Sequence, residues 1–184
     1  GCSAGGRSGT RAAAAARPSI HGHEATILEK IIKPIRNEPG CALLLHPVPK
    51  SAPFYEHYSM RISHPMDFDT LQANVMSTAA GGPGASKALG FGSNDKVDAT
   101  AQYEHVDEFV RDARRIFSNA IRYNCYLDKS STALRRTFTS LLYKFEARLL
   151  EWNRKNFPHD AILPPTPPLK LCLSAIEGAF QTLT

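Results

Sequence analysis

The chain has 184 residues, of which 42% are hydrophobic and 21% charged, and these proportions are typical of a soluble globular domain. Its formal charge of +5 is uneven, because Arg7, Arg11 and Arg17 supply three charges within residues 1–23, which contain no acid. No stretch approaches the roughly 20 apolar residues of a membrane span, so we expect no membrane partner. The four cysteines are too few and too far apart for a disulfide scaffold or a metal pair. We therefore expect a reducing compartment, no metal and no cofactor.

The N-terminal residues 1–23 are rich in Gly, Ala, Ser and Arg without apolar periodicity, which predicts a disordered tail. Arg and Ser without acids also fit a transit peptide, although large apolar residues are lacking. A first helix is predicted over about residues 24–37, and Pro34 should weaken its last turn. Its apolar stripe recurs at spacings of three and four: Ile27, Leu28, Ile31, Ile32 and Ile35.

Residues 41–66 differ from the rest, because they combine four prolines with many large apolar side chains and fit neither a helical nor a strand period. We predict a long apolar loop that packs on the fold and frames a pocket. A short helix is predicted from Asp67, as its cap, to about Met76. Its inward-facing residues are Phe68, Leu71, Val75 and Met76.

The second half of the chain alternates low-complexity segments with two long helices. Residues 77–102 predict a flexible Gly/Ala-rich insertion, and residues 158–184 predict a Pro-rich linker followed by a short helix. Helices are predicted over about 103–123 and 131–156. The first should expose Glu104, Asp107, Glu108, Arg111 and Arg114, and the second should bury Leu134, Phe138, Leu141, Leu142, Phe145, Leu149 and Trp152. With no convincing strand, four packed helices form the economical all-α architecture.

Four short motifs follow one another along the chain in an order that is typical of a known family. Residues 44–48 read Leu-Leu-His-Pro-Val, Tyr58 follows, residues 65–68 read Pro-Met-Asp-Phe, and residues 116–124 end in Tyr-Asn. In this order and helical context, residues 24–157 resemble a bromodomain. The resemblance implies a left-handed four-helix bundle with a long apolar loop between helices 1 and 2. It also implies a nuclear, non-enzymatic module that binds acetylated lysine on histones or other chromatin proteins.

The resemblance also implies a set of acetyl-lysine-binding residues. Acetylation replaces the lysine charge with a neutral amide, whose carbonyl needs a donor such as an Asn side chain. Asn124 would be that donor, Tyr58 would reach the same oxygen through water, and Tyr123 would pack behind Asn124. The remaining positions are the apolar wall Val48, the loop residues Pro47, Pro53 and Tyr55, the shelf residue Leu44, and a gate at Ser130 or Ser131.

The sequence departs from the family at the shelf, where Trp-Pro-Phe is replaced by residues 42–44, Ala-Leu-Leu, and at Ser59, where a second tyrosine is common. These changes motivate an alternative, a helical interaction domain with lost or altered acetyl-lysine binding. Asn124 would then be an ordinary helix-terminal residue. A nucleic-acid surface formed by Arg111, Arg114, Arg115 and Arg122 is disfavoured, because a solvated face paired with Asp107, Glu108 and Asp112 is the simpler interpretation. Residues 24–157 carry only +3.

Overall fold

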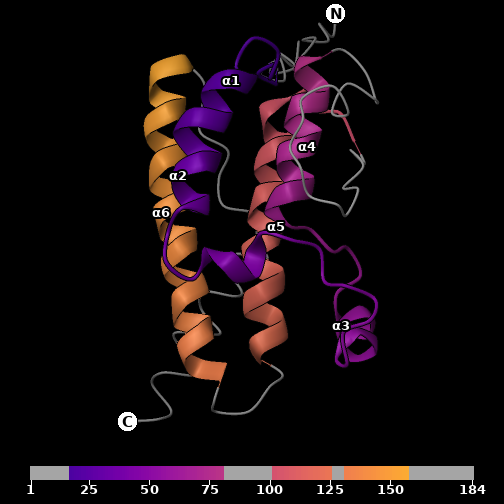
Figure 1. Ribbon diagram of the computed structural model, residues 1–184. Coiled ribbons are helices and arrows are strands. Elements are labelled where there is room, and N and C mark those ends of the chain that lie inside the picture. Colours follow the sequence, from indigo (N-terminus) through magenta and orange to yellow (C-terminus); the bar gives the residue numbers. More distant parts are fainter. Residues whose placement is uncertain (1–16, 81–100, 126–130, 158–184) are drawn as a thin grey trace, which may run out of the picture.

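The computed structural model describes residues 17–80, 101–125 and 131–157 (Figure 1). Within these ranges the chain is helical and forms no β-strand, only an isolated bridge between Ser19 and His105. This agrees with the predicted all-α class. None of the helices in the described ranges is long and apolar enough to cross a membrane. The predictions for residues 1–16, for 81–100 of the insertion, and for the linker and helix of 158–184 lie outside the described residues.

The first helical rod is continuous but changes its winding. It consists of α1 (Glu24–Ile27), a π-helical stretch, η1 (Leu28–Ile32), and α2 (Lys33–Arg36). The wide π turn immediately precedes the turn that contains Pro34, whose missing N–H and bulky ring disturb the regular i to i−4 ladder. The predicted helix over 24–37 therefore forms almost to its full length, with the disturbance placed before Pro34 rather than after it.

Residues 41–66 contain more regular structure than their sequence predicts. A 3₁₀ turn, η2 (Cys41–Leu44), opens the segment, and α3 (Tyr55–Arg61) follows, set apart from the other helices in Figure 1. The expectation of no regular structure was wrong because α3 has only seven residues. Tyr58 is its one buried residue, and a helix of so few turns does not reveal an apolar period.

The three remaining helices are α4 (Phe68–Ala79), α5 (Val106–Cys125) and α6 (Thr132–Asn156). Asp67 caps α4 as predicted, because its side chain accepts a hydrogen bond from the backbone N–H of Thr70 at 2.9 Å. The helices pack around one apolar core. At its centre the Phe117 ring lies 5.8 Å from that of Phe68 and 5.6 Å from that of Phe145, measured between centroids.

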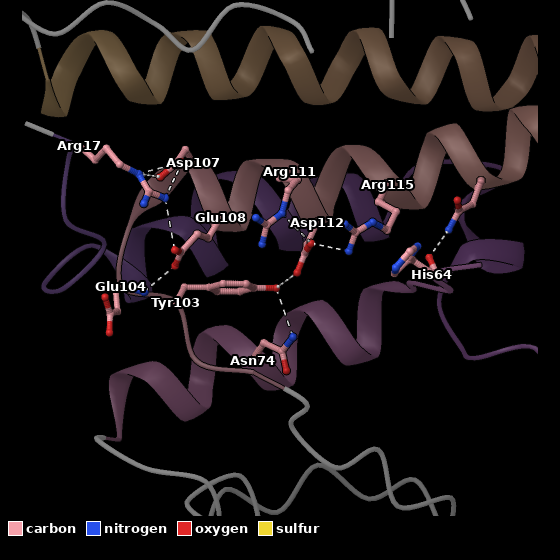
Figure 2. Close-up of polar contacts among 11 residues, drawn as sticks. Arg17, His64, Asn74, Tyr103, Glu104, Asp107, Glu108, Arg111, Asp112 and Arg115 are labelled. Carbon is pink, nitrogen blue, oxygen red and sulfur yellow. Dashed lines mark hydrogen bonds and ion pairs between the residues drawn. The ribbon is translucent and has the colours of Figure 1, made fainter. Parts of the chain in front are cut away.

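A buried polar cluster joins α4 to the start of α5, and we call it the Tyr103 clasp (Figure 2). The Tyr103 hydroxyl accepts a hydrogen bond from the Asn74 amide and donates one to Asp112, both at 3.2 Å. Asn74 also accepts from the backbone N–H of Ala101, and Thr78 from that of Tyr103. Burial raises the pKa of Tyr103, so its hydroxyl keeps the proton that it donates. The clasp thus fixes the chain on both sides of residues 81–100.

Residues 17–23, which the sequence assigned to a disordered tail, pack against the start of α5. The Arg17 guanidinium binds Asp107 and Glu108, as Figure 2 shows. The backbone N–H of Ile20 donates to the Glu104 carbonyl, and the Ile20 side chain is fully buried. A single large apolar residue in a short segment carries no periodic signal, so this docking is invisible to pattern analysis.

Arg114 corrects a second expectation, because the predicted wet side of this helix included it. Its side chain is only 5% exposed and forms a two-pronged ion pair with Glu146 of α6, at 2.7 and 2.8 Å. Arg114 lies one turn from Phe117 and one turn from Val110, both buried, and therefore on the face of α5 that meets α6.

Candidate functional site

A cavity of about 410 Å³ lies at the end of α5 opposite to the Tyr103 clasp. The loop of residues 43–66, the last turns of α5 and the first turns of α6 surround it. Its walls are mostly apolar, with a few polar groups among them. The lining residues are Leu43, Leu44, His46, Pro47, Val48, Phe54, Tyr58, Pro65, Met66, Asp67, Ile116, Asn119, Ala120, Tyr123, Asn124, Leu134 and Phe138.

Asn124 places an amide in this cavity. It lies inside α5, whose last residue is Cys125, and is 7% exposed. Its side-chain nitrogen donates to the Ala120 carbonyl one turn earlier, at 2.7 Å. An amide nitrogen carries two hydrogens, so this contact fixes the side chain and leaves one donor for a ligand.

Arg135 of α6 holds the backbone of Asn124. One guanidinium nitrogen donates to the Asn124 carbonyl at 3.1 Å, and the other donates to the Thr132 hydroxyl at 2.9 Å. The carbonyls in the last turn of a helix lack partners within the helix, and a cation is favourable there because of the helix dipole. Arg135 thereby couples the end of α5 directly to the start of α6.

An aromatic cluster attaches α3 to α5. Ring centroids of Tyr58 and Phe54 lie 5.2 and 6.4 Å from that of Tyr123, and the Tyr123 hydroxyl lies 3.3 Å from a ring nitrogen of His57. Tyr58 is almost fully buried, whereas Phe54 is 49% exposed. Tyr123 thus packs beside Asn124 and orients the aromatic wall of the cavity.

The loop is also attached at two other points. The Leu45 carbonyl accepts a hydrogen bond from the backbone N–H of Asp69, and the Asn119 amide donates to the His64 carbonyl, both at 2.9 Å. The Asp69 carboxylate contacts the His46 ring at 2.5 Å and Arg36 at 2.8 Å. These contacts set the positions of the loop walls relative to Asn124.

Two titratable groups shape the polar side of the cavity. Burial raises the pKa of Asp67, and hydrogen bonds from Thr70 only partly offset this effect. Burial also raises the pKa of Tyr58, with a further contribution from the nearby charge of Asp67. The Tyr58 hydroxyl therefore stays protonated at neutral pH and can donate a hydrogen bond inside the cavity. No group of three His, Cys, Asp or Glu side chains in the described ranges is arranged to hold a metal ion.

Six of the predicted site residues meet at this cavity: Leu44, Pro47, Val48, Tyr58, Tyr123 and Asn124. Pro53, Tyr55 and Ser131 do not line it, and Ser130 lies outside the described residues. The contribution of α6 comes instead from Leu134 and Phe138. Leu134, predicted as a core residue, is 37% exposed at the cavity.

Sequence reasoning also missed Phe54, His46 and Asn119 as lining residues. Phe54 was recognised only as one of the apolar residues of the loop. Asn119 stands one helical turn before Tyr123 and on the same face of the helix, so a helical projection from Tyr123 was the one available signal. A comparison with protein-family models finds no match for the chain, and a search of curated proteins finds none either. The geometry therefore carries the functional argument.

Proposed function

We propose that the chain is a bromodomain-type reader, which binds acetylated lysine in the cavity beside Asn124. The observation that carries the proposal is a mostly apolar cavity with the buried Asn124 amide in its wall. Six residues that the family resemblance singled out, far apart in sequence, line this one space. The finer form of the fold, a left-handed four-helix bundle, is part of the same proposal.

The chemistry of the cavity fits a neutral amide on an apolar stem. Val48, Leu44 and Phe138 offer apolar surface to the lysine methylenes, each of which contributes about 0.8 kcal/mol when buried. The remaining amide hydrogen of Asn124 can satisfy the acetyl carbonyl, as can the Tyr58 hydroxyl through water. Unmodified lysine would bring an ammonium group into the same apolar space, which costs several kcal/mol without a partner.

The proposed role is recognition without catalysis. By resemblance we place the chain in the nucleus, with acetylated histones or other acetylated chromatin proteins as partners. A single pocket of this size should bind isolated peptides weakly, and further modules on a longer protein would raise the avidity.

Calorimetry with an acetylated peptide and its unmodified counterpart tests the proposal. We expect binding of the acetylated peptide only, and a loss of at least about tenfold in affinity with Asn124→Ala, because one buried hydrogen bond is removed. Asn156→Ala is the matched control: its amide donates to the Trp152 carbonyl with the same i to i−4 geometry at 2.7 Å, far from the cavity. If the two variants bind the acetylated peptide equally well, the reader proposal fails.

One observation favours a second candidate, an interaction domain without acetyl-lysine binding. The Asn124 amide already has a partner in Ala120, as a purely structural asparagine would. In that case Asn124→Ala and Asn156→Ala would destabilise the fold by similar amounts, and no acetylated peptide would bind.

A further inference from the structure

Charge is distributed unequally along α5. The acids Glu104, Asp107, Glu108 and Asp112 lie at or near its first turns, and no acid follows between residues 113 and 125. Three of these acids form ion pairs: Asp107 and Glu108 bind Arg17, and Asp112 binds Arg115. In the described part of the chain, the second half of α5, which carries Asn124, contains no acid.

The segments around the cavity are correspondingly basic. We define the mouth as residues 41–66, 122–125 and 131–138, which together hold five bases and one acid. The bases are Lys50, Arg61, Arg122, Arg135 and Arg136, and the acid is Glu56. Asp67 adjoins the mouth, but its carboxylate is buried in the cavity wall.

Three of these bases stand out. Lys50 and Arg122 are exposed, and Arg135 is fixed against the Asn124 carbonyl by a hydrogen bond of 3.1 Å. Within the described ranges, none of these three forms an ion pair with an acid of the chain. The three histidines of the mouth each have a partner within the chain: His46 contacts Asp69, His57 contacts Tyr123, and His64 contacts Ser63.

We propose that the cavity takes acetylated lysine from an acidic stretch of polypeptide, in preference to the basic surroundings typical of a histone tail. This inference rests on the proposed function and names the class of partner that the same site selects. The acetyl group supplies the contact with Asn124. Aspartate or glutamate within a few residues of the modified lysine supplies complementary charge for Lys50, Arg122 and Arg135.

The expected effect is modest, because Lys50 and Arg122 are exposed to solvent and none of the three bases lines the cavity itself. Exposed ion pairs are worth little individually, and salt screens them over about 10 Å at 0.1 M. Several bases acting together raise the encounter rate with an acidic peptide and lower it with a basic one. We therefore expect a difference in affinity of about 3- to 10-fold between the two peptides, not an all-or-none choice.

A peptide fits this surface better than nucleic acid does. Affinity for a duplex depends on the number of phosphates that lysines and arginines neutralise, and the bases of the mouth are few. The arginines that would extend the surface along α5 are already used, since Arg114 binds Glu146 and both Arg111 and Arg115 bind Asp112.

The test uses three peptides with the same acetylated lysine, flanked on both sides by two Asp, two Gln or two Lys residues. We expect affinity to fall in that order at about 50 mM salt. The ratio between the affinities for the Asp-flanked and Lys-flanked peptides, which we call the spread, should shrink at about 0.5 M because of screening. Lys50→Gln and Arg135→Gln should each narrow the spread. Arg154→Gln removes the same charge from an exposed site near the other end of α6, and should leave the spread unchanged.

The outcomes separate this inference from the proposed function. Equal affinity for all three peptides, or tightest binding of the Lys-flanked one, overturns the acidic preference while the reader function stands. If no acetylated peptide binds, the proposed function itself fails. Salt-dependent binding of a DNA duplex that displaces the peptide and requires Lys50 and Arg135 would also overturn the inference.

Discussion

The two ends of α5 solve different physical problems. At the first end, polar groups are satisfied within the protein: Tyr103 bonds Asn74 and Asp112, and Asp112 also binds Arg115 (Figure 2). At the other end, Asn124 lines a mostly apolar cavity, and its amide has a second hydrogen beyond the one that it donates to Ala120. The first arrangement suits stability, and under the proposed function the second suits binding, so the two tasks would lie at separate places on one helix.

The separation is large enough for independent effects. Twenty residues of α-helix span about 30 Å, and substitutions more than about 10 Å apart usually act additively. Changes at the Tyr103 clasp should therefore alter the free energy of unfolding without changing ligand affinity. Changes that remove a ligand contact at the cavity should lower ligand affinity and leave the free energy of unfolding largely unchanged.

The largest effect is expected for Asp112→Ala at the clasp end. It removes the acceptor of the buried Tyr103 hydroxyl and the partner of the half-buried Arg115. We expect a loss of about 3 kcal/mol in the free energy of unfolding, and about 1 to 2 kcal/mol for Tyr103→Phe, which removes only the hydroxyl. Urea unfolding measures both, and calorimetry should find unchanged peptide affinity. A variant that unfolds normally but loses binding would refute the separation of the two ends.

The pocket end depends on a close backbone approach at Gly40. This residue has a φ of +85°, and an added Cβ would collide with the Cγ2 methyl group of Thr137 on α6. Gly22 has the same φ with open space around it. We expect about 1 kcal/mol of destabilisation for Gly22→Ala and about 2 to 3 kcal/mol for Gly40→Ala.

A second substitution isolates the collision at Gly40. Thr137→Ser removes the methyl group that the new Cβ would meet. In the Thr137→Ser background, Gly40→Ala should therefore cost only the backbone penalty of a left-handed φ, about 1 kcal/mol as at Gly22. Thermal or urea unfolding of the four variants gives the coupling energy. No coupling between positions 40 and 137 would contradict the close approach.

Asp67 distinguishes capping from buried charge at the same end. Asp67→Asn keeps an oxygen acceptor for the Thr70 N–H and removes the buried charge, whereas Asp67→Ala removes the cap. We expect Asp67→Ala to cost about 1 kcal/mol and Asp67→Asn much less. Because burial raises the folded-state pKa of Asp67, its contribution to stability is greatest at low pH and is lost as the pH rises through that pKa. As the pH falls towards 4, the free energy of unfolding of the wild type should therefore rise relative to that of Asp67→Asn. Urea unfolding at several pH values measures this difference.

Much of this organisation could be predicted from residue patterns. The long helices follow from apolar residues at helical spacing, and the cap at Asp67 follows from a polar residue before such a pattern. The residues Val48, Tyr58 and Asn124 were implied by the family resemblance, and the three segments that carry them meet at one cavity.

What the sequence did not reveal depends on tertiary contacts between single residues. Arg114 looks like a surface arginine until α6 brings Glu146 beside it. Leu134 belongs to the apolar stripe of α6, but it lies in the first turn of that helix. There the stripe lines the cavity instead of packing in the core. Ile20 docks alone. None of these depends on a periodic pattern, so propensity and spacing give no signal for them.

The smallest effect on the free energy of unfolding is expected from shortening residues 81–100, the segment between the two sides of the Tyr103 clasp. Residues 81–100 can be replaced by a short Gly/Ser linker, because Asn74 and Thr78 bind the backbone of Ala101 and Tyr103 on the far side. Loop-closure entropy changes by only about 0.6 kcal/mol for each doubling of length, so a threefold shortening should raise stability by about 1 kcal/mol or less. Urea unfolding should show this small change and calorimetry an unaltered peptide affinity. The same shortening combined with Asn74→Ala should be clearly less stable, because the linker alone cannot replace the buried hydrogen bonds that hold its two ends together.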